Sequence, residues 1–124
     1  DVGELAKTVL GDAYGFQYSP QQKVAYLLRE WASKRLPMAI TVDATCFDSS
    51  ITPSDVEREM EIFACNHANA LLVRALGKYY ASGPMVNGAG VEVGVRHCRA
   101  SGVYTTSSAN SITCWLKVSA ACRK

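Results

Sequence analysis

The segment from Pro37 to Ser50, PMAITVDATCFDSS, joins an apolar run to two acidic residues, Asp43 and Asp48. The apolar and β-branched residues at its start predict a buried strand over residues 38–43. Carboxylates are seldom buried without a partner, so the strand is expected to end near Ala44. This prediction places Asp43 at the tip of the strand and Asp48 on the turn that follows.

Two interpretations of these acids are open. An extended strand would separate the two carboxylates by about 16 Å and turn them to opposite faces, so they can approach one site only if residues 45–48 curl back. Acids at a strand tip suit a hard cation such as Mg²⁺, which takes oxygen ligands. The alternative is that Asp48 merely begins a turn with the two serines that follow it. The isolated D-x4-D spacing favours the turn.

A second polar segment, RASGVYTTSSANSITCWLK, runs from Arg99 to Lys117. Its Ser101-Gly102 pair predicts a flexible turn, and a helix is expected over residues 105–121. The core-facing stripe of that helix is predicted to contain Ile112, Leu116 and Ala120, with Trp115 beside them. A polar stripe adjoins it, made of Thr106, Asn110, Thr113 and Lys117.

Polar side chains at the edge of a core face either a neighbouring element or a ligand. Hydroxyl and amide groups of this kind can recognise the hydroxyls of a sugar by hydrogen bonding. The alternative is that the Ser and Thr side chains cap the helix or bond to its own backbone. The pattern of this helix does not choose between the two.

The rest of the chain predicts further helices and a hairpin. Ser-Pro and Thr-Pro pairs are typical helix starts, which predicts helices over residues 20–35 and from residue 53 onward. A further helix is predicted over residues 70–80. Residues 82–98 alternate around Asn87-Gly88 and predict a β-hairpin. The expected fold class is therefore α/β (α+β), with helices packed on a short sheet plus a β-hairpin.

Composition narrows the possible functions only slightly. The chain has 124 residues, 48% of them hydrophobic, which suits one domain with a modest core. A formal charge of +2 is too small to identify a nucleic-acid-binding protein. No apolar run approaches the roughly 18 residues of a membrane span, so no membrane segment is expected. Five cysteines without a CxxC pair argue against both a disulfide framework and paired zinc ligands.

Together, the two polar segments resemble motifs A and B of viral RNA-dependent RNA polymerases. Motif A corresponds to Asp43 and Asp48, and motif B to Ser101, Gly102, Thr106 and Asn110. The likeness continues in YGFQYSP (14–20), CFDSS (46–50), CRASGVYTTS (98–107) and TCWLKVSAACR (113–123), which are similar to polymerases of the hepatitis C virus group. ITVDATCFDSSIT and ALGKYYASG resemble the GB virus (pegivirus) branch still more closely. The resemblance covers nearly the whole chain.

The resemblance implies roles for these residues in RNA-directed RNA synthesis by two-metal nucleotidyl transfer. Asp43 would be a ligand of Mg²⁺ or Mn²⁺, with the backbone carbonyl of Ala44 as a helper. Asp48, a second catalytic residue, would sense the ribose of the incoming nucleotide together with Ser101 and Asn110. Thr106 would orient that network.

Arg96 and Arg99 are candidates for contacts with the RNA backbone, because phosphates attract Arg and Lys. The alternative for both is a solvated hairpin edge.

The implied architecture is one partial catalytic domain, residues 1–124, of a right-handed polymerase. The palm would comprise about residues 1–50 and 103–124, and the fingers about residues 51–102. The chain begins with Asp rather than Met, and its C-terminal stretch has no helix terminator, so both ends are expected to continue in a longer chain. These polymerases complete their metal site with a Gly-Asp-Asp turn, which does not occur here, so this fragment is expected to be inactive alone.

The implied partners are template and product RNA, ribonucleoside triphosphates and other viral replication proteins. The implied location is the host cytoplasm, at membrane-associated replication complexes. Two competing interpretations remain, namely a noncatalytic RNA-binding module and a structural interaction module. The first would need a basic face with interleaved aromatic residues, and the second does not explain the two polar segments.

Overall fold

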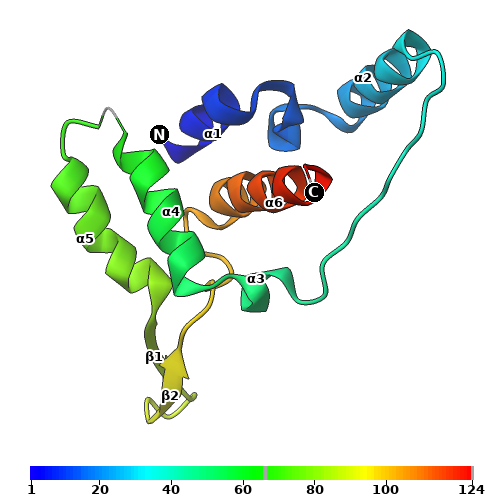
Figure 1. Ribbon diagram of the computed structural model, residues 1–124. Helices are drawn as coiled ribbons and strands as arrows, with labels where there is room; N and C mark the ends of the chain where they lie inside the picture. Colours follow the sequence, from blue (N-terminus) through cyan, green and yellow to red (C-terminus); the bar gives the residue numbers. More distant parts are fainter. Residues whose placement is uncertain (66, 124) are drawn as a thin grey trace.

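In the computed structural model, which describes residues 1–65 and 67–123, three helices enclose one core (Figure 1). They are α1 (Val2–Leu10), α4 (Pro53–Ala64) and α6 (Thr106–Cys122). The core residues come from these helices and the turns beside them: Ala6, Leu10, Tyr14, Ile51, Val56, Met60, Phe63, Ala109 and Ile112. Residues distant in sequence therefore meet in a single apolar cluster.

The helix starts follow local capping rules. Ser19 begins α2 (Pro20–Ser33) and Thr52 begins α4, each with a proline at the first helical position and a reciprocal capping box. Both starts confirm the sequence-based predictions, although α2 ends at Ser33 rather than near residue 35. Helix α1 was not predicted; its N-terminal cap is the side chain of Asp1, which accepts a hydrogen bond from Gly3 N at 2.9 Å. Two short 3₁₀ turns, η1 (Gly11–Ala13) and η2 (Gly15–Gln17), connect α1 to α2.

Helix α5 (Ala70–Ala81) packs against α4 and confirms the helix predicted over residues 70–80. Gly77 lies at the contact between these two helices. A Cβ atom added at Gly77 would lie 2.6 Å from Cγ of Met60. Glycine therefore allows the two helices to approach closely here.

The predicted hairpin is present as β1 (Gly83–Val86) and β2 (Glu92–Arg96), paired antiparallel with Gly83 opposite Arg96. Its turn is longer than the two-residue Asn87-Gly88 turn of the prediction. The backbone N–H of Asn87 donates to Val91 O at 2.9 Å, and the Asn87 side chain accepts from the backbone N–H of residues 89 and 91. The hairpin extends away from the helices (Figure 1).

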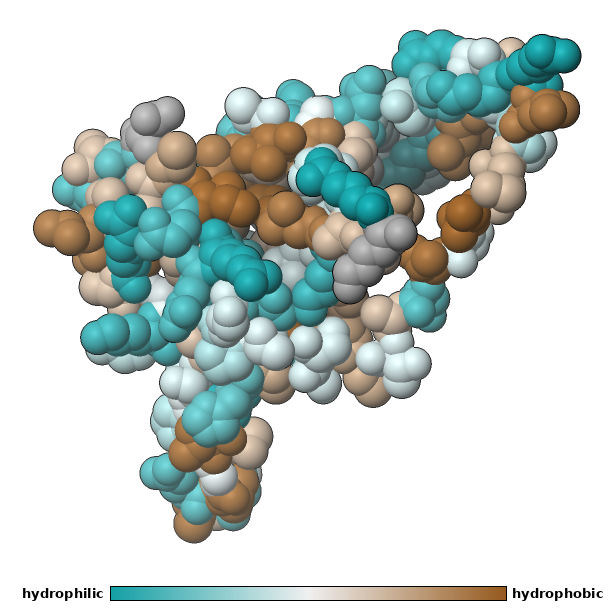
Figure 2. Space-filling view, in the orientation of Figure 1, coloured by the Kyte–Doolittle hydropathy of each residue, from teal (hydrophilic) through white to brown (hydrophobic). Residues whose placement is uncertain are grey.

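The strand predicted over residues 38–43 is wrong, because this segment is extended but unpaired. A strand forms when its backbone groups bond to a neighbouring strand, and the only sheet among the described residues is the β1–β2 pair. Leu36, Met38, Ile40 and Val42 are 63–88% exposed, and apolar side chains follow one another along this stretch in Figure 2. The mixed α and β class is confirmed, but its sheet is the hairpin alone.

Helix α2 lies apart from the helices that form the core (Figure 1). Its apolar stripe follows the spacing of a buried helix face, yet Val24, Leu27, Leu28 and Trp31 are 51–66% exposed. None of the described residues covers this stripe. Among those residues, no helix is long and apolar enough to cross a membrane.

Candidate functional site

The chain turns between Asp43 and Asp48. Cys46 has φ 49° and ψ 58°, the left-handed conformation that is unfavourable for residues other than glycine. The short helix α3 (Phe47–Ser50) follows and carries Asp48. The backbone N–H of Arg99 donates to Asp48 O at 3.1 Å, which fixes α3 against the chain leading to α6.

Asp48, Ser101 and Asn110 meet in space, and we call them the polar cluster. Ser101 Oγ donates to Oδ2 of Asp48, and Asn110 Nδ2 donates to Oδ1 at 2.7 Å. The hydrogen bonds from Ser101 and then Asn110, with a smaller contribution from the charge of Arg99, hold the pKa of Asp48 below its usual range despite some burial. The carboxylate is therefore ionised at neutral pH. The predicted convergence of these three residues is present in the structure.

Thr106 and Gly102 shape the turn that carries Ser101. Thr106 Oγ1 donates to the carbonyl of Ala100 at 3.1 Å, which ties the first turn of α6 to the loop before it. Gly102 has φ 81°, a conformation that only glycine adopts without strain. This local geometry orients Ser101 toward Asp48.

A buried ion pair lies directly behind the polar cluster. Glu59 of α4 is 0% exposed, and its carboxylate accepts from both terminal nitrogens of Arg99, with Nη1 at 2.8 Å. Nε of Arg99 donates to Oδ1 of Asn110 at 2.7 Å. Arg99 is thus buried and paired, so the prediction that it contacts the RNA backbone is wrong for this structure, because only 1% of its side chain is exposed.

Arg96 is also engaged within the chain. Its guanidinium donates to the backbone carbonyls of Tyr79 and Tyr80, each at 3.1 Å, and to that of Cys98. These bonds tie the base of the hairpin to the end of α5. They leave Arg96 half-buried, and no described contact bears on its predicted role with RNA.

The C-terminal half of the polar stripe of α6 bonds to α4. Thr113 Oγ1 donates to Glu59, and Lys117 Nζ bonds to Asp55 Oδ2 at 2.9 Å. Burial raises the pKa of Asp55, but the bonds from Lys117 and from Thr52 outweigh it, so this pKa lies below its usual range. The predicted apolar stripe is buried only at Ile112. Leu116 and Ala120 are exposed because α6 extends past the core.

Asp43 and Ala44 lie exposed at the end of the unpaired segment. Among the described residues, no group donates a hydrogen bond to the Asp43 side chain. Those residues contain no group of three His, Cys, Asp or Glu side chains that could hold a metal ion. The structure therefore unites Asp48, Ser101 and Asn110 without adding Asp43 to them.

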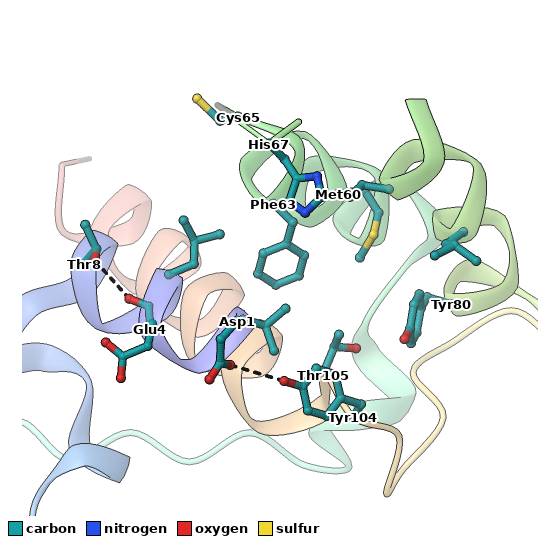
Figure 3. A pocket seen from close by; sticks show the side chains of 14 residues that line it. Asp1, Glu4, Thr8, Met60, Phe63, Cys65, His67, Tyr80, Tyr104 and Thr105 are labelled. Atoms are coloured by element: carbon teal, nitrogen blue, oxygen red, sulfur yellow. Dashed lines mark hydrogen bonds between the residues drawn. The ribbon is translucent and has the colours of Figure 1, made fainter. Parts of the chain in front are cut away.

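Two hollows flank these elements. A groove of about 530 Å³ adjoins the polar cluster and is lined by Thr106 and Asn110 together with Phe47 of α3. A larger pocket of about 670 Å³ lies between α1, α4 and α5, where Phe63 and Met60 line it and Tyr104 donates to Asp1 at 3.2 Å (Figure 3). Only the groove contains residues predicted to bind a nucleotide.

Sequence reasoning missed Glu59, although a signal was available. Glu59 lies three residues after Val56 and four before Phe63, so it falls on the apolar face of α4. A charged residue at such a position needs a buried partner. The chain offers several cations, and the sequence did not indicate that Arg99 would be that partner.

Comparisons with known proteins test the resemblance to viral RNA-dependent RNA polymerases. A family model described as viral RNA dependent RNA polymerase matches residues 2–124. The chain is 47% identical, over 97% of its length, to the genome polyprotein of hepatitis C virus genotype 6d (isolate VN235). It is also 47% identical, over 98% of its length, to that of genotype 1c (isolate India). The chain spans only 4% of each polyprotein. It therefore belongs to the viral RNA-dependent RNA polymerase family.

Proposed function

We propose that this chain is part of an RNA-directed RNA polymerase and that its polar cluster recognises the ribose of the incoming nucleotide. The observation that carries the proposal is the ionised Asp48 carboxylate, held by Ser101 and by Asn110, the latter of which also lines an open groove. Membership of the polymerase family supports the proposed reaction, and the hydrogen-bonding groups of the polar cluster support the proposed recognition of the ribose.

The chemistry of the cluster suits a sugar with a free 2′-hydroxyl. Each carboxylate oxygen has two lone pairs, and the contacts with Ser101 and Asn110 occupy one on each oxygen of Asp48. A lone pair on each oxygen stays available for a substrate hydroxyl. The 2′-hydroxyl is what distinguishes RNA from DNA precursors, so such a contact would select ribonucleotides.

Asp43 and the carbonyl of Ala44 are the residues that would hold a divalent cation. Both are exposed oxygen donors at a chain bend, and Mg²⁺ and Mn²⁺ prefer oxygen ligands. When bound in pairs, such ions supply charge stabilisation to phosphoryl transfer and lower the pKa of the attacking hydroxyl. One carboxylate and one carbonyl are too few ligands for such an ion. We infer that other parts of the full-length polymerase supply the rest and that this chain alone is inactive.

The remaining parts of the proposal follow from the family. Template and product RNA and ribonucleoside triphosphates would be the binding partners, with other viral replication proteins alongside. The site of action would be membrane-associated replication complexes in the host cytoplasm. The division into palm (about 1–50 and 103–124) and fingers (about 51–102) stays a prediction.

The role of Asp43 is tested by Asp43→Asn in the full-length polymerase. The amide is a much weaker ligand than the carboxylate, so RNA synthesis is expected to fall by at least about 100-fold, as for other groups that stabilise transition-state charge. Glu57→Gln on the exposed side of α4 is the matched control, since it also neutralises one acid. Retention of most activity by Asp43→Asn would refute the metal role.

Sugar recognition is tested by Asn110→Ala in the same enzyme. The substitution removes the Nδ2 donor to Asp48, so the ratio of kcat/KM for ribonucleotides to that for 2′-deoxynucleotides is expected to fall about 3- to 10-fold, as for one lost hydrogen bond. Asn69→Ala at the start of α5 is the control, because the Asn69 side chain makes no capping bond. An unchanged ratio in Asn110→Ala would argue against ribose sensing.

A further inference from the structure

We propose that the buried pair Glu59–Arg99 is a positioning device that fixes the Asn110 amide toward Asp48 and thereby sets the preference for ribose. This inference rests on the proposed function and adds two residues to its specificity site. Neither residue touches the groove in which a nucleotide would lie. Both would act through Asn110 and through the backbone at Asp48.

The proposed positioning begins with the ion pair between Arg99 and Glu59, which is buried in the core. The side chains of Arg99 and Glu59 are 1% and 0% exposed, and the two terminal nitrogens of the guanidinium each bond to a different oxygen of the carboxylate. Thr113 donates a further hydrogen bond to Glu59. A bidentate pair of this kind holds the guanidinium in one plane. Its third nitrogen, Nε, then has a fixed direction.

That fixed nitrogen decides which way the Asn110 amide points. An arginine is always a donor, so the amide must present its oxygen, Oδ1, to Nε, as it does at 2.7 Å. Nδ2 is thereby turned toward Asp48, where it donates at 2.7 Å. The flipped amide would set its NH₂ group against the guanidinium and its oxygen against the carboxylate. Both contacts would be repulsive, so Arg99 enforces the orientation that Asp48 requires.

Arg99 also holds Asp48, which accepts the hydrogen bond from the Asn110 amide. Its backbone N–H donates to the carbonyl of Asp48 at 3.1 Å, while its side chain holds Asn110. One residue therefore sets the position of α3 and the polarity of the amide that faces it. Asp55 and Lys117, the next ion pair between α4 and α6, make no contact with the polar cluster.

The test measures sugar discrimination in the full-length polymerase. The double substitution Glu59→Leu with Arg99→Met removes the Nε donor without leaving a buried unpaired charge, and such replacements are often tolerated. Its ratio of kcat/KM for ribonucleotides to that for 2′-deoxynucleotides is expected to fall about 3- to 10-fold, as for one lost hydrogen bond. The loss should fall on ribonucleotides, whereas a merely structural defect would lower both values equally.

Three comparisons make the outcome decisive. Adding Asn110→Ala to the double substitution should lower the ratio no further than Asn110→Ala alone, because both act through one contact. Arg99→Lys, which keeps a charge for Glu59 but lacks Nε, should show the same loss and serves if the double substitution does not fold. Arg74→Lys, in the exposed bidentate pair with Glu61, is the matched control and should leave the ratio unchanged.

The possible results separate the two proposals. A wild-type ratio in both the double substitution and Arg99→Lys, together with a lowered ratio in Asn110→Ala, would overturn the positioning role and leave ribose sensing intact. A wild-type ratio in Asn110→Ala would overturn ribose sensing, and the positioning role with it. Equal losses for ribo- and deoxynucleotides in the double substitution would show a purely structural role and would also overturn the inference.

Discussion

Substituting Arg99 alone should be far more damaging than substituting it together with Glu59. Arg99→Met leaves the Glu59 carboxylate at 0% exposure with neither of the guanidinium donors that now neutralise it. Breaking a buried pair by removing one partner costs about 3–5 kcal/mol. The change should appear in α4 and α6, because Glu59 and Asn110 anchor these two helices to Arg99.

Hydrogen exchange of the full-length polymerase, followed by mass spectrometry, measures this cost locally. A loss of 3–5 kcal/mol corresponds to amide exchange about 10²- to 10⁴-fold faster in peptides from α4 and α6, in the regime where opening is reversible. Adding Glu59→Leu should restore most of the protection, because no unpaired charge stays buried. Arg74→Met, which breaks the exposed pair with Glu61, should leave exchange in these peptides nearly unchanged. Similar exchange in the single and double variants would refute this reasoning.

Two further predictions concern the contacts of α4 with α5 and with α6. Gly77→Ala would place a Cβ atom 2.6 Å from Met60 Cγ. The resulting overpacking, about 1–3 kcal/mol, should exceed the gain in helix propensity of about 1 kcal/mol and so speed amide exchange in α5. Slower exchange in α5 would contradict this prediction. Asp55→Asn should cost about 1–2 kcal/mol at neutral pH through the weakened contacts with Thr52 and Lys117. Because the folded-state pKa of Asp55 is lowered, its stabilisation is present above the unfolded value of about 3.9 and is lost as pH falls below it. Protection in the first turn of α4, taken relative to the intrinsic exchange rate at each pH, should therefore fall across that pH range in the wild type and not in Asp55→Asn.

The sequence predicted those parts of the fold that depend on neighbouring residues. The Ser-Pro and Thr-Pro pairs placed the starts of α2 and α4 at their observed first residues, and the predicted end of α2 lies two residues beyond the observed one. The strand over residues 38–43 failed because its formation depends on a neighbouring strand rather than on its own residues. Helix α1 was overlooked even though its cap and apolar spacing are local features.

The candidate site was predictable only in part, for a related reason. The motif spacing identified Asp48, Ser101 and Asn110, and the chain does bring them together. The motif spacing did not reveal that Arg99 is buried, because the partner of Arg99, Glu59, lies 40 residues away in the sequence. The pattern of α6 likewise left open whether its polar stripe meets a ligand or a neighbour. In the structure Thr113 and Lys117 bond to α4, whereas Thr106 and Asn110 line the groove.

The exposed apolar side chains of α2 and the unpaired segment 37–44 have a consequence for biosynthesis. While a chain of this sequence emerges from the ribosome, these apolar side chains are exposed, because none of the described residues covers them. The core of α1, α4 and α6 forms only after α6 has been synthesised, because α1 and α6 lie near opposite ends of the sequence. We expect chaperones that bind exposed apolar segments to bind nascent chains here.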